Sequence, residues 1–545
     1  MPFSISIEGV GLKTFDNPVS GKDVLSLCTL DDRPVVAWHV NNYLRPLTWV
    51  VSDHAEVDFV DTSTFEGMAV YRNTLSFLLV VACKKTLGRE LFIRHSISDG
   101  FFCELQGGAP TQDELKLLRG SLKKLIEEDI PIDMEIVPLD RAKKIFKAQN
   151  DVRKADLLGA ACMDPVTVWL CDGIYGHFYT PLAPSAGYIK SWDLVSFRNG
   201  VVLRFPTVTS PQGLPPFRPP KKLADVFEEY AGWLDILGVN TMESLHRYVA
   251  SGKAQELILV SEALHNQKLN EIAYEIIKKG DVKVVCIAGP SGSGKTTTAK
   301  RLAITLRVRG KKTAVISLDD YFLDRERTPR DADGNPDFES IEALDLDFLH
   351  HQLEMILEGK EIILPKFNFI SGKREQGPRL KLEEQGVAII EGIHGLNQRI
   401  TDVVPEEKIY KIFVSPLTGI SMDQYNRTST TDNRLLRRLV RDYRTRGKNA
   451  EATLLQWPSV IKGAQRYIFP YQEQADRMFN SALVYELPVL KGYTEALLRS
   501  VKESSPAYGE AQRLLTLSQY IPFIPSDAVP NTSILREFIG GSCFE

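Results

Sequence analysis

The stretch from Val282 to Lys300 restricts the folds available to this chain more than any other. An apolar, β-prone run at 284–288 leads into Gly289-Pro290-Ser291-Gly292-Ser293-Gly294-Lys295-Thr296, and a helix-compatible segment follows. The octapeptide fits G-x-x-x-x-G-K-[ST] at every fixed position. A strand, this loop and a helix are together the context of a phosphate-binding loop.

Physical chemistry explains the residue types in the loop. Glycines lack Cβ, so the backbone turns tightly and points several N–H groups at one anion, beside the positive end of a helix. Lys295 has the reach for β- and γ-phosphates, and the Thr296 hydroxyl is suited to bind Mg²⁺. The alternative is a glycine-rich turn with an accidental Lys-Thr, which the flanking segments disfavour. We therefore predict that 289–297, including Thr297, binds a nucleoside triphosphate.

Composition narrows the class of protein. A chain of 545 residues predicts several domains, and a net charge of −4 provides no global basic field for nucleic acid. The seven cysteines are scattered without a C-x-x-C pair, which favours a reducing compartment over zinc knuckles or a disulfide framework. We see no signal peptide or membrane-spanning run, so the sequence predicts a cytoplasmic, multidomain enzyme.

The N-terminal half predicts two small α+β domains. Residues 1–62 predict a small β-rich module, in which Pro34–Leu44 and Asp53–Phe59 resemble the TGS domain of threonyl-tRNA synthetases. This resemblance implies a β-grasp-like fold. Residues 63–205 resemble the second, editing-type domain of those enzymes, through His95–Leu105 and Tyr175–Gly187. The resemblance implies the fold but not a synthetase, because no class II aminoacylation domain follows.

The editing chemistry is expected to be absent. That family uses two His and then a Cys-His pair, and the matching positions here are Asn73, Phe77, Phe178 and Leu182. These side chains cannot replace His and Cys as metal ligands or polarise a water. His95 and His177 remain nearby, and we expect structural or surface roles for both because neither has a second ligand at metal-binding spacing.

A proline-rich stretch at 205–222 separates the two halves. Six prolines in eighteen positions prevent a helix or a central strand, so a linker is favoured over a groove ligand for a partner. Apolar spacing then predicts helices over 223–280. We assign 206–280 as a linker with a helical bridge.

Two carboxylates follow the next apolar strand. Lys312–Phe322 predicts a buried strand that ends in Asp319 and Asp320. In doubly wound sheets the chemistry lies at the carboxyl ends of strands, where an acid accepts a proton from a hydroxyl or helps to bind Mg²⁺. We assign that role to Asp319 and expect Asp320 to cap the next turn.

These features resemble the uridine kinase branch of the phosphoribulokinase/uridine kinase family over about 282–480. The resemblance implies an α/β P-loop kinase, a parallel sheet flanked by helices, at 281–545. Ser317-Leu-Asp-Asp-Tyr-Phe322 matches the family motif that carries the catalytic base, which becomes Asp319. Glu339 takes the place of an Asp that binds the ribose hydroxyls.

The family's base-pocket motif is only partly kept in Pro365–Arg374. Phe367 and Phe369 retain its two aromatic positions, and Arg374 retains its arginine, so these residues are assigned to the substrate. Flat rings stack on nucleobases, although core packing explains Phe367 and Phe369 equally well. Gly372 stands where the family has a base-reading His, which puts pyrimidine specificity in doubt.

The remaining assignments lie further along the chain. Glu391 ends the apolar strand 386–391, and the family places a Mg²⁺-supporting acid there. Residues 434–448 carry seven cations and match the family's lid over the phosphates, with Arg438 and Arg441 stabilising the transferred group. Lys448 replaces an Arg, and Gln456 matches a nucleoside-contacting Gln. The alternative for this basic run is a solvated helix or an RNA contact.

The sequence thus predicts an ATP- and Mg²⁺-dependent kinase that acts on the 5′-hydroxyl of a ribonucleoside. Lys295, Arg438 and Arg441 stabilise the phosphoryl group, Asp319 is the base, and Thr296 with Glu391 or Asp319 binds the metal. One alternative is a sugar, sugar-phosphate or non-pyrimidine acceptor; another is an NTP-switched RNA-binding regulator. RNA contact by the N-terminal half is not favoured, no membrane partner is expected, and a homo-oligomer stays open. The tail predicts one more strand and helix at Leu483–Ala496.

Overall fold

The N-terminal module is a mixed sheet around one parallel pair. The computed structural model describes residues 2–28, 34–208, 210–211, 213–330, 334, 336–368 and 371–544. The strand order is β2-β1-β7-β4-β5, with β1 and β7 parallel, and Trp38 is fully buried beneath it. The elements are β1 (Phe3–Ile7), β2 (Gly11–Phe15), β3 (Val19–Ser20), α1 (Gly21–Leu25), β4 (Val35–Val40), β5 (Tyr43–Pro46), β6 (Val50–Val51) and β7 (Ala55–Asp61).

The second module packs two antiparallel sheets against a central helix, α2 (Phe65–Leu87). Residues 74–83 of α2 are buried without interruption. A helix that is apolar on all sides must lie inside a core, which explains why the module surrounds it. The other elements are β8 (Leu91–Ile97), β9 (Gly100–Leu105), α3 (Gln112–Glu127), β10 (Ile132–Val137), α4 (Leu139–Ala148), α5 (Val152–Ala161), β11 (Val166–Cys171), β12 (Ile174–Gly176), β13 (Asp193–Phe197) and β14 (Gly200–Arg204).

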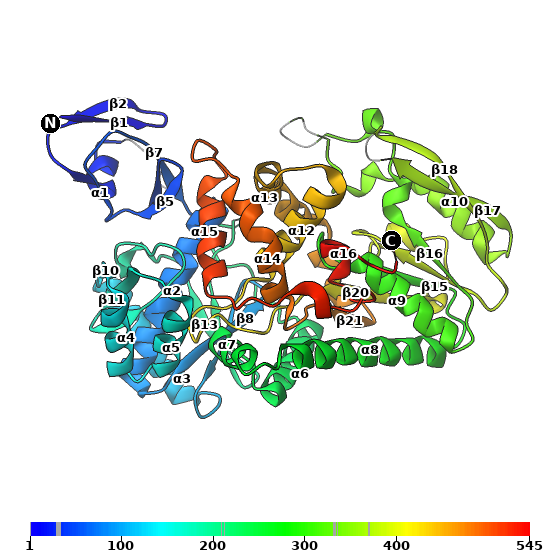
Figure 1. The fold of residues 1–545 in the computed structure, drawn as a ribbon, viewed down its shortest axis with the longest axis horizontal. Helices are drawn as coiled ribbons and strands as arrows, with labels where there is room; N and C mark the ends of the chain where they lie inside the picture. Colours follow the sequence, from blue (N-terminus) through cyan, green and yellow to red (C-terminus); the bar gives the residue numbers. More distant parts are fainter. Residues whose placement is uncertain are drawn as a thin grey trace.

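Three helices connect this half to the next. The described part of 205–220 contains no helix or strand, and α6 (Lys221–Leu237), α7 (Met242–Ala250) and α8 (Ala254–Lys279) follow. Helix α8 runs along the lower edge of the molecule towards the kinase-like sheet (Figure 1). The domain boundaries drawn from the sequence stay a prediction.

The C-terminal half contains the predicted parallel sheet. Its order is β16-β19-β15-β20-β21, and every neighbouring pair is parallel. All five residues of β15 are buried, as expected for a central strand covered by helices on both faces. The strands are β15 (Val284–Ala288), β16 (Thr313–Ser317), β19 (Val387–Glu391), β20 (Ile409–Ser415) and β21 (Arg477–Asn480), with a hairpin of β17 (Glu361–Asn368) and β18 (Lys373–Lys381).

Helices surround this sheet, and the last ones return to the N-terminal half. They are α9 (Lys295–Val308), α10 (Leu346–Leu357), α11 (Gln398–Thr401), α12 (Thr430–Arg446), α13 (Ala450–Tyr467), α14 (Glu486–Arg499), α15 (Tyr508–Gln519) and α16 (Arg536–Ile539). Helices α14 and α15 lie between the two halves (Figure 1). The Asn42 side chain donates to Glu503 O (3.0 Å), which ties the first module to the loop before α15.

Buried polar groups join the second module to the C-terminal half. Lys154 forms an ion pair with Asp423, and both side chains are almost fully buried. His177 Nε2 lies 3.0 Å from the Tyr520 hydroxyl, and burial lowers the pKa of His177 to about 4. His95 stacks on Phe227 of α6 with ring centroids 3.8 Å apart. Both histidines are therefore packed between the halves.

No group of three or more His, Cys, Asp or Glu side chains within the described residues is arranged to hold a metal ion. No helix in that part of the chain is both long and apolar enough to cross a membrane.

The Lys154–Asp423 pair generates a stability prediction. Replacing Asp423 by Ala leaves a buried ammonium without its partner, so we expect the free energy of unfolding to fall by about 3 kcal/mol. The double variant Lys154→Met, Asp423→Leu removes both charges and should recover most of that loss. Urea denaturation checks this, with Lys123→Ala, from an exposed pair, as control. An unchanged midpoint for Asp423→Ala would contradict the structural role of the pair.

Candidate active site

The loop between β15 and α9 has a backbone that only glycine accommodates at three positions. Gly292 and Gly294 have φ of 78° and 81°, in the left-handed region that L-residues with a side chain rarely adopt. A Cβ on Gly289 would lie 2.0 Å from Val414 O of β20. The loop therefore combines tight turns with close packing against the neighbouring strand.

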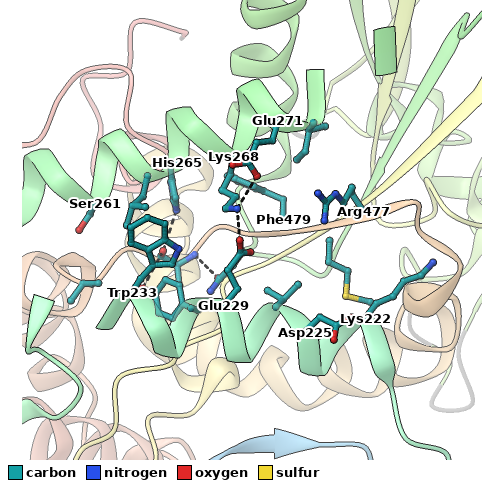
Figure 2. Close-up of a pocket in the computed structure, with 18 of the residues that line it drawn as sticks. Lys222, Asp225, Glu229, Trp233, Ser261, His265, Lys268, Glu271, Arg477 and Phe479 are labelled. Atoms are coloured by element: carbon teal, nitrogen blue, oxygen red, sulfur yellow. Dashed lines mark hydrogen bonds and ion pairs between the residues drawn. The ribbon is translucent and has the colours of Figure 1, made fainter. Parts of the chain in front are cut away.

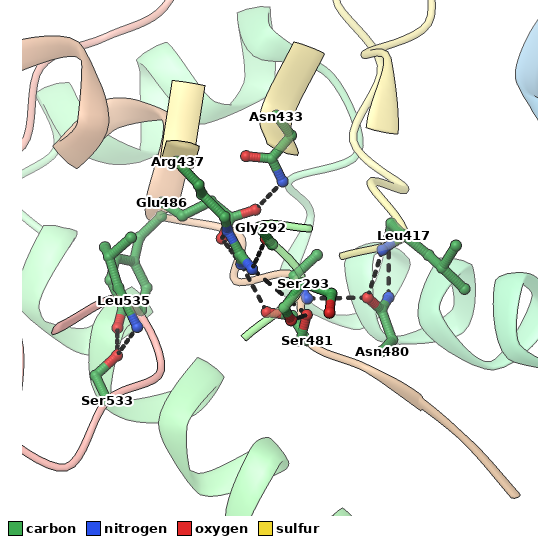
Figure 3. A network of polar contacts seen from close by, with 12 residues as sticks. Gly292, Ser293, Leu417, Asn433, Arg437, Asn480, Ser481, Glu486, Ser533 and Leu535 are labelled. Atoms are coloured by element: carbon green, nitrogen blue, oxygen red, sulfur yellow. Dashed lines mark hydrogen bonds and ion pairs between the residues drawn. The ribbon is translucent and has the colours of Figure 1, made fainter. Parts of the chain in front are cut away.

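The loop's carbonyl groups are held from outside. Arg434 Nε donates to Ser291 O (2.9 Å), Arg437 Nη1 donates to Gly292 O (3.3 Å), and Ser481 Oγ donates to Ser293 O (2.5 Å). Figure 3 shows Arg437 and Ser481 converging on Gly292 and Ser293. A peptide group whose carbonyl is fixed on one side presents its N–H to the other, so these bonds shape an anion-binding concavity.

The guanidinium of Arg437 is itself balanced by a carboxylate. Arg437 and Glu486, at the start of α14, form an ion pair in which both side chains are almost fully buried. Asn433 Nδ2 also donates to Glu486 (Figure 3). Arg437 belongs to the basic run that the sequence assigns to a lid. In this structure it holds the loop and does not face an open site.

The carboxylate at the end of β19 lies beside the loop. Glu391 accepts hydrogen bonds from Thr296 Oγ1 (3.1 Å) and Ser317 Oγ (2.9 Å) and is 4% exposed. Burial and then the charge of Asp319 raise the pKa of Glu391 to about 7. Lys295 Nζ donates to Pro290 O (3.4 Å). Burial lowers the pKa of Lys295, and the negative charges of Glu391 and Asp319 oppose part of this decrease. One electrostatic cluster therefore joins the loop to two strand ends.

The adjacent carboxylates after β16 have different surroundings. Asp320 Oδ1 accepts from the backbone N–H of Phe367 (3.1 Å) and lies 3.3 Å from Lys366 Nζ. Asp320 therefore fixes β17 to the end of the sheet. The sequence predicted instead that Asp320 caps the next turn. Asp319 is half-buried in the 3₁₀ turn Leu318–Tyr321, near Lys295 and Glu391.

Helices α12 and α13 bring the other predicted polar residues together. Arg438 Nη1 donates to Ser291 Oγ (2.9 Å) and Nη2 donates to Gln456 Oε1 (3.0 Å). Lys448 Nζ donates to the same Gln456 oxygen (2.8 Å). Arg441 pairs with the buried Asp442 (2.9 Å). The predicted residues 438, 448 and 456 thus form one connected group at the loop.

The predicted substrate residues fall in two places. Glu339 packs against α13, where a Cβ added to Gly463 would lie 2.7 Å from the Cβ of Glu339. Burial raises the pKa of Glu339, and the positive charges of Arg438, Lys295 and Arg434 oppose this increase. Phe367 is 3% exposed and packs edge-on against Phe322, 5.7 Å away, so its role as a base platform stays a prediction.

Arg374 lies near the start of β18. Arg374 Nη1 binds Asp345 Oδ2 (2.8 Å). Phe369 lies outside the described residues. A Cβ on Gly372, the position of the missing His, would be 2.8 Å from Arg325 Nε.

Sequence reasoning missed several residues at the loop. Arg434 is predicted only as part of the basic run, and Ser317 and Ser481 have no predicted role of their own. Glu537 has none either, and it accepts from the Thr297 N–H (3.1 Å) and hydroxyl (2.8 Å). The spacing of 434, 437, 438 and 441 places these arginines on one helix face, which is a signal for the first of them. Glu537 follows the loop by about 240 residues, and no motif marks it.

A separate pocket lies behind β21. It has a volume of about 360 Å³ between α6, α8 and β21, and it is lined both by apolar side chains such as Trp233 and Phe479 and by charged ones such as Asp225 and Arg477 (Figure 2). The charged side chain of Lys268 at its rim is paired with Glu229 and Glu271. His265, which also lines it, lies with Nε2 3.1 Å from Ala482 O, next to Ser481.

Comparisons with known proteins identify relatives of the segment that contains this site. Residues 284–486 match the sequence model of the Phosphoribulokinase / Uridine kinase family. A uridine kinase of Staphylococcus epidermidis is 28% identical over 194 residues, covering 35% of this chain and 84% of that protein. A uridine kinase of Saccharomyces cerevisiae is 28% identical over 202 residues, 36% of each chain, so this chain spans about a third of that relative.

Solved structures also match part of this chain. A possible uridine kinase from Bacillus stearothermophilus is 20% identical, covers 39% of this chain and 97% of its own, and gives a TM-score of 0.26. A D-glycerate 3-kinase from Cryptococcus neoformans is 14% identical, covers 38% and 89%, and gives 0.28.

The sequence matches agree with the phosphate-binding loop described above. The relatives found by sequence indicate an ATP-dependent kinase that phosphorylates a hydroxyl group. The segment 284–486 of this chain is a domain of the phosphoribulokinase/uridine kinase family.

Proposed function

We propose that the domain at 281–545 transfers the γ-phosphoryl group of ATP to the 5′-hydroxyl of a ribonucleoside. The observation that carries the proposal is the cluster of the loop, Lys295, Glu391 and Asp319 at the carboxyl ends of neighbouring parallel strands. Ligands of open α/β sheets bind at this edge. The relatives named uridine kinase support a nucleoside acceptor.

The loop's role in this proposal is to bind the phosphates. The N–H groups of 289–297 surround the β-phosphate, while Lys295 neutralises charge on the β- and γ-phosphates. Arg438 and Arg441 lie on the helix that holds the loop and stabilise the transferring phosphoryl group. Arg438 already reaches Ser291 (2.9 Å), so little movement is needed to contact a phosphate.

The residues present also fit Mg²⁺. The Thr296 hydroxyl and the Glu391 and Asp319 carboxylates are hard oxygen donors, and Mg²⁺ in phosphoryl-transfer sites takes one or two carboxylates beside the substrate's phosphates. Thr296 already donates to Glu391 (3.1 Å), so the two oxygens lie close together. When bound, the ion supplies charge neutralisation to the phosphates.

Asp319 acts as the general base in the proposed reaction. Its carboxylate accepts the proton of the 5′-hydroxyl as that oxygen bonds to the γ-phosphorus. The bond from the γ-phosphorus to the bridging oxygen breaks at the same time, and ADP leaves.

The acceptor's sugar is assigned to Glu339 and the group around Gln456. Glu339 shares its surroundings with Arg438, so a ribose bound there lies within reach of the loop. Lys448, Phe367, Phe369 and Arg374 are kept as further substrate residues. Because Gly372 carries no side chain for reading a base, the proposal extends to non-pyrimidine nucleosides.

For the N-terminal half we propose a non-catalytic role on TGS- and editing-type folds. Phe77 and Phe178, at two positions of the family's editing site, pack against each other with centroids 5.3 Å apart and are buried. Leu182 is fully buried, and Asn73 donates to Thr180 Oγ1 (2.5 Å). These contacts fill the region with packed side chains, which supports a structural or regulatory module.

The phosphate role of Lys295 is tested by Lys295→Ala. Removing this charge should lower kcat/KM for ATP by about 10²- to 10³-fold, as for other preorganised electrostatic groups. Acceptor-dependent ADP release measures the effect. Lys278→Ala, an exposed change on α8, should leave it within twofold. Retained turnover in Lys295→Ala would contradict the site.

Asp319 and Asp320 provide a matched pair. Asp319→Asn should lower kcat by about 10²- to 10⁴-fold, because the carboxylate that accepts the proton is lost. Asp320→Asn should mainly lower the melting temperature, because its carboxylate fixes Phe367. Stopped-assay kcat and thermal unfolding of both variants separate the roles, and the reverse pattern would refute the assignment of the base.

A panel of acceptors tests the proposed function itself. ADP release should be stimulated by at least one ribonucleoside and less by its 2′-deoxy form, since Glu339 is assigned to the ribose hydroxyls. Glu339→Gln should raise the KM of that ribonucleoside about tenfold and weaken the preference over the deoxy form. If only simple sugars or sugar phosphates stimulate ADP release, the acceptor is one of these compounds and the proposal of a nucleoside acceptor is wrong.

A further inference from the structure

The C-terminal residues 529–544, here called the tail segment, lie on the helix that follows the loop. Lys300 Nζ of α9 donates to Phe544 O (2.6 Å), and Arg444 Nη1 of α12 donates to Phe538 O (2.7 Å). Ile534, Leu535 and Phe538 are fully buried. The segment is therefore a packed part of the fold, beside α9 in Figure 1.

The tail segment reaches the phosphate-binding loop itself. The Glu537 carboxylate accepts from the Thr297 N–H (3.1 Å) and from its hydroxyl (2.8 Å). A Cβ on Gly294 would lie 2.4 Å from Ile534 Cγ2. Glu537 and Ile534 thus cover the first turn of α9, next to Arg437, whose guanidinium carbon lies 5.1 Å from the centroid of the Phe538 ring.

The Thr297 N–H is one of the donors that a triphosphate needs. The first N–H groups of a helix have no partner within the helix, and together with the loop they bind phosphate oxygens. Glu537 places a negative charge on one of these donors. Its charge also acts on Lys295 and Glu391, so it shares the electrostatic site of the loop.

We propose that Glu537 is an internal mimic of a nucleotide phosphate, which ATP must displace from Thr297 in order to bind. The proposal rests on the proposed function, since it takes ATP as the ligand of the loop. The side chain alone has to rotate, because Lys300 and Arg444 hold the backbone of the tail segment through the carbonyls of Phe544 and Phe538. The tail segment therefore sets the affinity of the kinase for ATP.

Population arithmetic gives the size of the effect. If the loop is free of Glu537 for only about a tenth of the time, the apparent Kd for ATP is raised about tenfold. A change that removes the carboxylate charge but keeps the side-chain shape should recover this factor. It leaves the buried Ile534, Leu535 and Phe538 in place, so the fold is retained.

The test compares Glu537→Gln and Glu537→Ala with the wild-type chain. The Kd for ATP, measured by titration calorimetry without acceptor, should fall about tenfold in Glu537→Gln and at least as much in Glu537→Ala. Asp527→Asn makes the same charge change at an exposed position just before the tail segment and should leave the Kd unchanged. A melting temperature for each variant controls for folding.

The other outcomes separate the two proposals. Equal or weaker ATP binding by Glu537→Gln, with normal binding by the wild type, overturns the mimic and leaves the proposed function standing. Absence of ATP binding in all forms overturns both. Binding by the Glu537 variants alone supports both, and it should disappear when Lys295→Ala is added.

Discussion

The fixing of the loop carbonyls is the constraint on which the C-terminal half depends. In the absence of ligand, a phosphate-binding loop must leave several N–H groups without hydrogen-bond partners. A loop that nothing held in place would change its conformation to satisfy them. Arg434, Arg437 and Ser481 prevent this by holding three consecutive carbonyl oxygens on the outer side. The Arg437–Glu486 pair then has to be buried, and it is tolerable only because each charge is balanced and hydrogen-bonded.

This constraint links distant parts of the chain to the loop. Glu486 begins α14, so the position of α14 is tied to α12 and the loop. At the first turn of α12, Arg513 of α15 binds both oxygens of Asp432 (3.0 and 2.8 Å). The same Asp432 interacts electrostatically with Arg72 of α2, in the N-terminal half. The helix that carries Arg438 and Arg441 therefore binds α15 and interacts electrostatically with the N-terminal half.

The parts of the site that sequence predicted are those fixed by local geometry. The loop pattern specifies a strand, a turn and a helix, and strand-end acids follow from the alternation of strands and helices, so Lys295, Thr296, Asp319 and Glu391 could be found. Phe367 shows the limit, because an aromatic residue in a strand has the same pattern whether it packs in a core or stacks on a base. Arg437 was assigned to a lid because a basic helix face does not reveal which arginines are buried.

Glu486, Ser481 and Glu537 could not be predicted, because their roles arise from packing between segments distant in sequence. The tail was expected to add a strand and a helix at 483–496. The helix is present as α14, but the strand β21 ends before this stretch, at Asn480, and the described residues add the helices α15 and α16 beyond it. No periodicity in the sequence indicates that α16 packs next to the phosphate-binding loop. The N-terminal fold types likewise rest on short motifs and stay predictions.

Hydrogen exchange of the loop amides is the most direct measurement of the central claim. If the N–H groups of 289–297 bind the phosphates, adding ATP with Mg²⁺ should slow exchange in a peptide covering this stretch. The Lys295→Ala variant should show a much smaller change at the same ATP concentration. Unchanged exchange in the wild-type chain at saturating ATP would contradict the account.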